Sequence, residues 1–257
     1  MKHWILYCKT LLAICVFIPL QASAYNVSPS IVTLYSIGSA SSTFFRIDNR
    51  GPKPTAVEFQ ILEHSKDIHG KPIKGEDAGD DFVIYPSQVV LMPGDETSVQ
   101  VLWIGDSHLE RERAYTFLAR EVAIPKDASE QVGNESGMRL DITVLMNYEG
   151  RVYVTPPGTK PNLVLEAVNQ NPVVESPSMI EVIVANHGSA HKSLINISLI
   201  FEPLDANGTV LKDKTISLAS SEVPAMRAHL LAGSKRRLLI PRPAGLPLGK
   251  FNLLLSE

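Results

Sequence analysis

Two histidines are the first residues whose spacing could do chemistry in this 257-residue chain. His187 and His191 are four residues apart, a spacing that brings two metal ligands together on a helix. The sequence around them, Asn186-His-Gly, indicates a turn instead. We therefore interpret both histidines as surface-loop residues and expect no metal site.

Carboxylates are the next candidates, and they occur in two short hydrophilic stretches. The first is the stretch 70–81, and the second alternates in charge from Glu110 to Arg113. Both patterns are typical of solvated loops and turns. The acidic residues of the first stretch are Glu76, Asp77, Asp80 and Asp81.

Motifs for catalysis are missing from the sequence. It contains no Gly-x-Ser-x-Gly, no phosphate-binding glycine-rich loop and no His-Glu-x-x-His. The only two cysteines, Cys8 and Cys15, lie in an N-terminal segment that we expect to be removed. The sequence therefore predicts neither an enzyme nor a cofactor.

The first 24 residues have the pattern of a secretory signal peptide. A basic start is followed by an apolar run from Thr10 to Leu20 and by the ending Ala22-Ser-Ala24. A membrane anchor is the alternative, but the run is shorter than the roughly 20 residues that a bilayer requires. We predict cleavage after Ala24 and a mature chain that does not insert into a membrane.

The overall charge is small. The formal net charge is −3, and the basic residues form no long block. A protein held to nucleic acid by phosphate contacts is therefore not expected.

From Tyr25 onward the sequence predicts short strands separated by turns. Period-2 or β-branched runs end at Gly, Pro, Asn and Asp, and no amphipathic helix comes between them. This pattern favours antiparallel β-sandwiches, because parallel sheets need helical crossovers. The expected strands are 42–48, 56–62, 98–104, 178–184, 193–201, 235–240 and 250–255, with a hairpin turn at 205–209.

The chain length and a proline-rich segment predict two domains. Thr155-Pro-Pro-Gly-Thr-Lys-Pro161 forms a stiff linker. We expect a first domain at 25–156 and a second at 157–257.

The longest expected strand, 139–154, follows a polar loop at 126–137. Leu140, Ile142, Val144 and Met146 share one face of it. A strand that outruns its sheet would expose this apolar row, so a partner that lacks a strand could cover it by β-augmentation. Alternatively, the row fills the protein's own sandwich.

Three segments resemble periplasmic pilus chaperones of the chaperone-usher pathway. They are Tyr85–Trp103 with its Pro-Gly turn, Arg113–Pro125 with its Arg-Glu pair, and the interdomain motif Val152-Tyr-Val-Thr-Pro156. The resemblance implies an all-β chain with two immunoglobulin-like β-sandwich domains arranged in an L. It also implies a periplasmic chaperone that holds pilus or fimbrial subunits by donor-strand complementation and delivers them to an outer-membrane usher, with possible self-association through the exposed edge.

The resemblance further implies site residues. The donor strand would use Leu140, Ile142, Val144 and Met146. Arg151 occupies the position of one of the family's two basic residues for the terminal carboxylate of the subunit. The first strand, Tyr25–Ser36, has no Lys or Arg for the second position. That role falls to Arg120 or to backbone donors.

A different class of function is also compatible with the sequence. A secreted two-domain immunoglobulin-like adhesion module would have the same strands. Disulfides are usual in such modules, and the predicted mature chain has no cysteine.

Overall fold

The computed structural model describes residues 25–124, 144–170 and 179–256. The predicted signal peptide and the predicted polar loop at 126–137 lie outside these ranges. The described chain is all-β, and its helical elements are single 3-10 turns. None of its helices is long and apolar enough to cross a bilayer.

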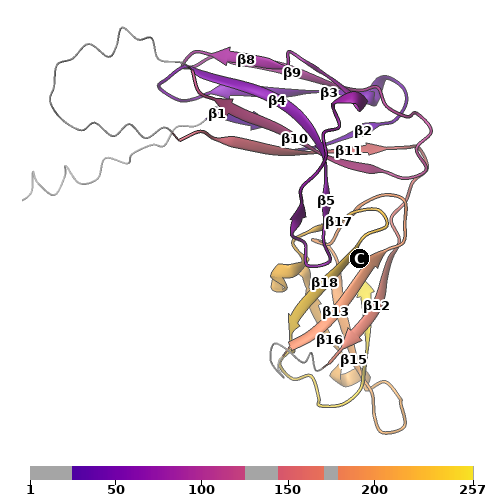
Figure 1. Ribbon diagram of the computed structural model, residues 1–257. Coiled ribbons are helices and arrows are strands. Elements are labelled where there is room, and N and C mark those ends of the chain that lie inside the picture. The colour runs from indigo at the N-terminus through magenta and orange to yellow at the C-terminus, as the bar shows by residue number, and fades with distance from the viewer. Residues whose placement is uncertain (1–24, 125–143, 171–178, 257) are drawn as a thin grey trace, which may run out of the picture.

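Two β-sandwiches meet in an L, as Figure 1 shows. In the first, one sheet has the order β1-β3-β9-β7 and the other β2-β11-β10-β4-β8. The strands of the first sheet are β1 (Tyr25–Ser28), β3 (Ser42–Asn49), β7 (Phe82–Tyr85) and β9 (Glu96–Trp103). Those of the second are β2 (Ile31–Tyr35), β4 (Thr55–Glu63), β8 (Gln88–Leu91), β10 (Arg113–Val122) and β11 (Asn147–Thr155).

Alternating burial builds the core between these two sheets. Every second residue of β4 from Thr55 to Ile61 is buried, as expected for a strand with one face on the core. Phe117 stacks on Phe45 from the opposite sheet, with ring centroids 4.1 Å apart. The two sheets are thereby joined by aromatic packing.

The second sandwich has its own apolar core, which includes Ile180, Leu199, Phe201 and Leu238. Its sheets have the orders β12-β13-β18 and β16-β15-β19. Their strands are β12 (Leu163–Asn169), β13 (Met179–Asn186), β15 (Ser198–Pro203), β16 (Ile216–Ala219), β18 (Lys235–Pro241) and β19 (Phe251–Ser256). The exact division at Pro156 stays a prediction.

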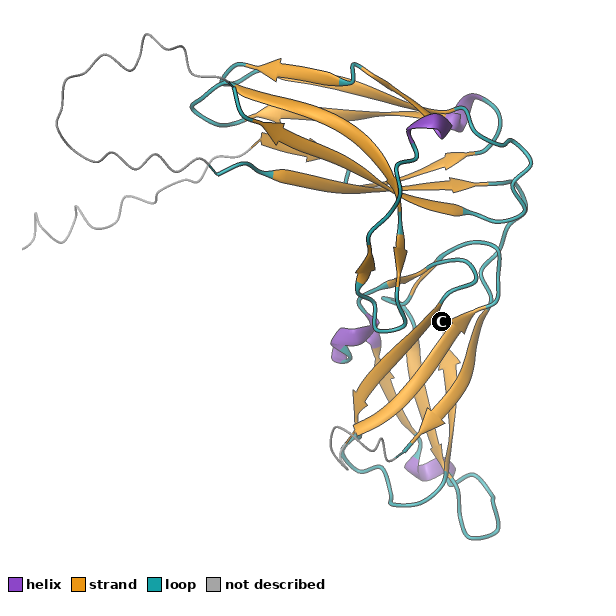
Figure 2. Cartoon of the chain, in the orientation of Figure 1, coloured by secondary structure: helices purple, strands orange, loops and turns teal. Residues whose placement is uncertain are grey.

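Two-residue strands and 3-10 turns complete the fold, and the secondary structure is shown in Figure 2. The short strands pair as β5 (Ser65–Lys66) with β6 (Pro72–Ile73), and β14 (Lys192–Ser193) with β17 (His229–Leu230). The 3-10 turns are η1 (Ser39–Ser41), η2 (Gly79–Asp81), η4 (Lys212–Lys214), η5 (Ser220–Glu222) and η6 (Pro224–Met226).

Three expectations from the sequence need correction. The stretch 70–81 is not a plain loop, because it contains β6 and η2. The expected strand 193–201 is interrupted by a turn in which the Ile197 N–H donates to the Leu194 carbonyl, 3.2 Å away. Leu194 and Ile197 are both buried in that turn, so their apolar pattern resembled a strand.

The third correction concerns the length of the strand expected at 139–154. Within the described residues, the strand begins only at Asn147. Just before it, the Glu121 N–H of β10 still donates to the Met146 carbonyl, and residues 139–143 of the expected strand lie outside the described ranges.

Candidate functional site

Strand β11 changes its surroundings at Arg151. On one side it pairs antiparallel with β10 from Asn147 to Val154. On the other side it pairs in parallel with β2, but only from Arg151 to Thr155. Residues 147–150 have no strand partner on that side among the described residues, because β1, the preceding strand, belongs to the opposite sheet. Unpaired edges of this kind bind added strands.

An apolar row follows the same strand from the core into solvent. Val152 and Val154 are fully buried, and Tyr148 packs partly against the core. Further along the row, Met146 is 45% exposed and Val144 is 72% exposed. Leu140 and Ile142, the other members of the predicted donor row, lie outside the described residues. Val152 and Val154 therefore fill the protein's own sandwich, while Met146 and Val144 are accessible to a partner.

Three hydrogen bonds that join the backbone of Met146 to Tyr25 and Glu121 hold this exposed segment against the first sandwich. The Tyr25 hydroxyl lies 2.6 Å from the Ala119 carbonyl oxygen and 3.1 Å from that of Met146. The Glu121 N–H also donates to the Met146 carbonyl, and the Met146 N–H donates to the Glu121 carboxylate. Burial and the nearby Glu121 raise the pKa of Tyr25 to about 12, so its hydroxyl stays protonated as a donor.

Arg151 lies where the free edge ends. Its Nη1 donates to Thr116 Oγ1 at 2.9 Å, and its Nη2 is 3.6 Å from Glu149 Oε2. The Arg151 side chain is 23% exposed, whereas that of Glu149 is 60% exposed. A half-sheltered guanidinium of this kind can bind a carboxylate through two parallel hydrogen bonds.

Arg120 is not brought next to Arg151. It pairs across β10 and β11 with Asn147, whereas Arg151 pairs with Thr116, four residues along the strand. The Arg120 guanidinium is bonded to Glu58 Oε1, with its Nε at 2.6 Å. It lies on β10, across β11 from the free edge, opposite Asn147 and four pairs from Arg151.

The structure places another cation near Arg151, one that sequence reasoning missed. Lys66, on β5, is half-buried, and burial, Arg151 and Arg236 all lower its pKa. His64, immediately before β5, is buried as well, and burial, Arg151 and Lys66 lower its pKa to about 4. No local pattern in the sequence pointed to Lys66, because its position depends on how the β5–β6 hairpin folds against the junction.

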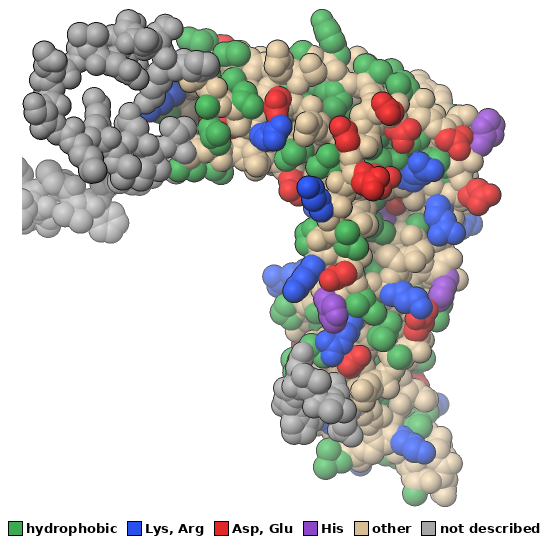
Figure 3. Space-filling model, viewed as in Figure 1, with side chains coloured by type: hydrophobic (Ala, Val, Ile, Leu, Met, Phe, Trp, Pro, Cys, Tyr) green, Lys and Arg blue, Asp and Glu red, His purple; other side chains and the backbone are tan. Residues whose placement is uncertain are grey.

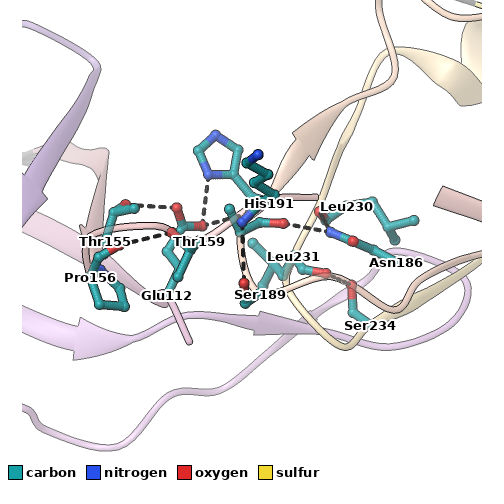
Figure 4. A network of polar contacts seen from close by, with 12 residues as sticks. Glu112, Thr155, Pro156, Thr159, Asn186, Ser189, His191, Leu230, Leu231 and Ser234 are labelled. Carbon is teal, nitrogen blue, oxygen red and sulfur yellow. Dashed lines mark hydrogen bonds and ion pairs between the residues drawn. The ribbon is translucent and has the colours of Figure 1, made fainter. Parts of the chain in front are cut away.

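A buried carboxylate, Glu112, ties the two domains together (Figure 4). The Glu112 side chain is only 3% exposed. It accepts hydrogen bonds from Thr155 Oγ1 at 2.7 Å and from the His191 backbone N–H at 3.0 Å, and it lies 2.7 Å from His191 Nδ1. The Tyr153 ring stacks on the His191 ring, with centroids 3.8 Å apart.

This arrangement corrects two expectations from the sequence. The segment from Glu110 to Arg113 is not wholly solvated, because Glu112 is buried. His191 is a junction residue and not a surface-loop residue, whereas His187 pairs with Glu166 at 3.2 Å. No group of three potential metal-binding side chains occurs in the part of the chain that the structure describes.

Comparison with known proteins gives a match at the level of structure. No family model matches this chain, and no curated protein matches it either. The solved class 5 fimbriae chaperone CfaA superposes with a TM-score of 0.56 at 11% sequence identity, covering 91% of this chain and 99% of that chain. A chaperone-tip adhesin complex of CFA/I fimbriae gives a TM-score of 0.57, also at 11% identity, with 91% and 98% covered.

A third solved structure, the Salmonella enterica SafA pilin in complex with the SafB chaperone, gives a TM-score of 0.50 at 15% identity, with 85% and 84% covered. This chain has the fold of the pilus chaperones. Within that fold, the free edge of β11 lies between Arg151 and the exposed residues Met146 and Val144, all on one stretch of chain in the first domain.

Proposed function

We propose that this protein is a periplasmic chaperone that binds pilus or fimbrial subunits lacking a strand and delivers them to an outer-membrane usher. The observation that carries the proposal is the change along β11. Its apolar row is buried where β2 covers the strand, packs partly on the core at Tyr148 along the free edge, and is exposed at Met146 and Val144, just before the strand begins. A subunit strand paired along this edge would take Val144 and Met146 into its own core.

Support also comes from the solved structures of the same fold. Two of them are complexes in which a chaperone is bound to a tip adhesin or to a pilin. The subunit-binding role is proposed for this chain from the shared fold and from the exposed part of its own apolar row.

The position of Arg151 supports a carboxylate contact at the end of that strand. A subunit strand along the free edge would end beside β2, where the guanidinium is half-sheltered. Charge-assisted, bidentate binding there fixes the register of the strand as well as its affinity. Arg120, on β10 opposite Asn147, is the second basic residue of the proposed site, and Leu140 and Ile142 extend its donor row.

The remaining parts of the proposal concern cell biology. The predicted leader, cleaved after Ala24, would export the chain to the periplasm, and the free edge would allow the protein to associate with itself when no subunit is bound. No nucleotide, metal or enzymatic step is needed, because completion of the subunit's own core drives the exchange.

Co-purification tests this function directly. A subunit that lacks its last strand is co-expressed in the periplasm with the wild-type chain, with Val144→Asp, or with the control Val90→Asp. Val90, on β8, is 66% exposed and matches Val144 closely in exposure. We expect Val144→Asp to abolish recovery of the subunit, because an ionised group would be buried in the subunit's core, whereas Val90→Asp leaves it unchanged. Equal recovery with both variants would overturn the proposal.

A further inference from the structure

The β5–β6 hairpin leaves the first domain and contacts the second. In Figure 1 it extends from the end of β4 towards β17 and β18. The Arg237 N–H on β18 donates to the Ile68 carbonyl at the hairpin tip, 2.7 Å away. Gly70, with φ of 78°, lies against Arg236, because a Cβ there would be 0.9 Å from Arg236 Nη1. The hairpin therefore brings its own Lys66 close to Lys235 and Arg236 of β18 in the second domain.

A small cavity lies between the hairpin and the second domain. Lys66, Arg236 and His229 line it, together with Asp67, Leu230, Leu231, Ser234 and Lys235. Two nitrogen atoms in this wall, Nε of Arg236 and Nδ1 of His229, are buried and have no hydrogen-bond partner among the described residues. The Nε–H of Arg236 is a donor, and a buried donor without a partner costs free energy, so this position favours a bound acceptor.

The acidic groups near the cavity are already engaged. Glu166 pairs with Lys235 at 2.7 Å, and Asp67 accepts the Lys71 backbone N–H at 2.8 Å. Across the described ranges, neither Lys66 nor Arg236 has a carboxylate at ion-pair distance. In Figure 3, Lys and Arg side chains lie among acidic and histidine side chains where the hairpin meets the second domain.

Electrostatic repulsion follows from this placement. Lys66 interacts with both Arg151 and Arg236 while it is partly buried, and the combination lowers its pKa. His229 has a lowered pKa from burial, His191 and Lys66, partly offset by Glu112. Like charges held together out of water destabilise the folded state unless an anion joins them.

We propose that Lys66 and Arg236 form an oxyanion site that links the hairpin to the second domain, with Arg151 as its neighbour on the first domain. The ligand is a carboxylate or a phosphate group, because an arginine fork and an ammonium group match the oxygen atoms of both. Two sources of this chemistry exist. One is a free inorganic anion, and the other, which rests on the proposed function, is the terminal carboxylate of a bound subunit.

Thermal unfolding in the absence of any subunit tests the site itself. The Tm of the full chain is measured with sodium phosphate and with sodium chloride at equal ionic strength. We expect phosphate to raise the Tm, since it binds only the folded junction. If phosphate and chloride give the same Tm, the proposal fails, while the chaperone function remains testable by subunit recovery.

Matched variants locate the site. Lys66→Met and Arg236→Met should each weaken phosphate binding roughly tenfold or more, the loss expected for one charge-assisted hydrogen bond. Lys66→Arg should keep binding because it keeps the charge. Lys71→Met removes an exposed lysine of the same hairpin and should leave binding unchanged. Loss of binding with Lys71→Met to the same extent as with Lys66→Met would contradict the assignment, and Arg236→Met decides it if Lys66→Met does not fold.

Calorimetric titration distinguishes the two sources. A peptide with the last residues of a subunit is compared as the free acid and as the C-terminal amide. If the subunit carboxylate is the ligand, only the free acid binds, and phosphate competes with it. If both peptides fail to bind while phosphate binds, the site takes a free anion.

Discussion

Glu112 of the first domain binds His191 of the second through two separate contacts, one with its backbone N–H at 3.0 Å and one with its ring Nδ1 at 2.7 Å. Thr155 supplies a third donor to the same carboxylate, at the start of the interdomain linker. The Glu112 backbone N–H in turn donates to the Ser189 carbonyl. The domains are thus joined by a satisfied, buried network and not by the covalent linker alone.

Replacement of Glu112 by Gln should weaken this junction. The amide removes the charge and turns one NH2 group towards groups that need an acceptor, so we expect a loss of about 2–3 kcal/mol in the free energy of unfolding. Urea denaturation measures it. Glu110→Gln, two residues earlier at an exposed position, is the control. Equal stability of the two variants would show that the network contributes little.

His64 should make the protein less stable as the pH falls. Its pKa is about 4 in the folded protein, against 6.5 in an unfolded chain, because burial and two cations disfavour its charged form. The unfolded state therefore binds the extra proton between these two values. We expect about 3 kcal/mol of stability to be lost as the pH falls from 6.5 to 4.

Urea denaturation at several pH values checks this expectation. The profile of His64→Gln should be flatter than that of the wild type over the same range. His108→Gln, at a side chain that is 95% exposed, controls for the loss of a histidine. His229, whose pKa is also lowered, adds a loss of the same sign. A pH profile unchanged by His64→Gln contradicts the prediction.

The two arginines of the proposed site should differ in importance. Arg151→Ala should reduce the recovery of a co-expressed subunit at least tenfold, because it removes a half-sheltered cation at the end of the free edge. Arg120→Ala should have a smaller effect, because that guanidinium is already paired with Glu58. Co-purification measures both, and circular dichroism checks that the fold is kept. Arg46→Ala, at a 56% exposed side chain on β3, is the matched control, and full recovery with Arg151→Ala would disprove the anchoring role.

Removal of one hydroxyl should loosen the exposed part of the donor row. Tyr25→Phe loses the contacts with the Ala119 and Met146 carbonyl groups, at a cost of about 1 kcal/mol in the free energy of unfolding. Amide hydrogen exchange should become faster from Val144 to Gly150. Tyr85→Phe, at a residue that is 73% exposed, should change neither quantity. Unaltered exchange in Tyr25→Phe would mean that Glu121 alone holds the segment.

Local patterns in the sequence were sufficient for most strands of the fold. Period-2 runs such as 56–62 and 235–240 correspond to β4 and β18, because one face of each strand is buried. The same periodicity put Val144 and Met146 on one face with the buried Val152 and Val154. It did not separate a row that fills the protein's own core from one that is offered to a partner, since the two rows have the same pattern.

The tertiary structure alone decided which part of that row is exposed. The answer depends on where β2 begins to cover β11, and β2 is more than 100 residues away in the chain. The buried Glu112 and the clustering of Lys66 with Arg151 and Arg236 also depend on contacts between distant segments. A charged residue has the same appearance in a sequence whether water or another domain surrounds it, so only the folded junction distinguishes the two.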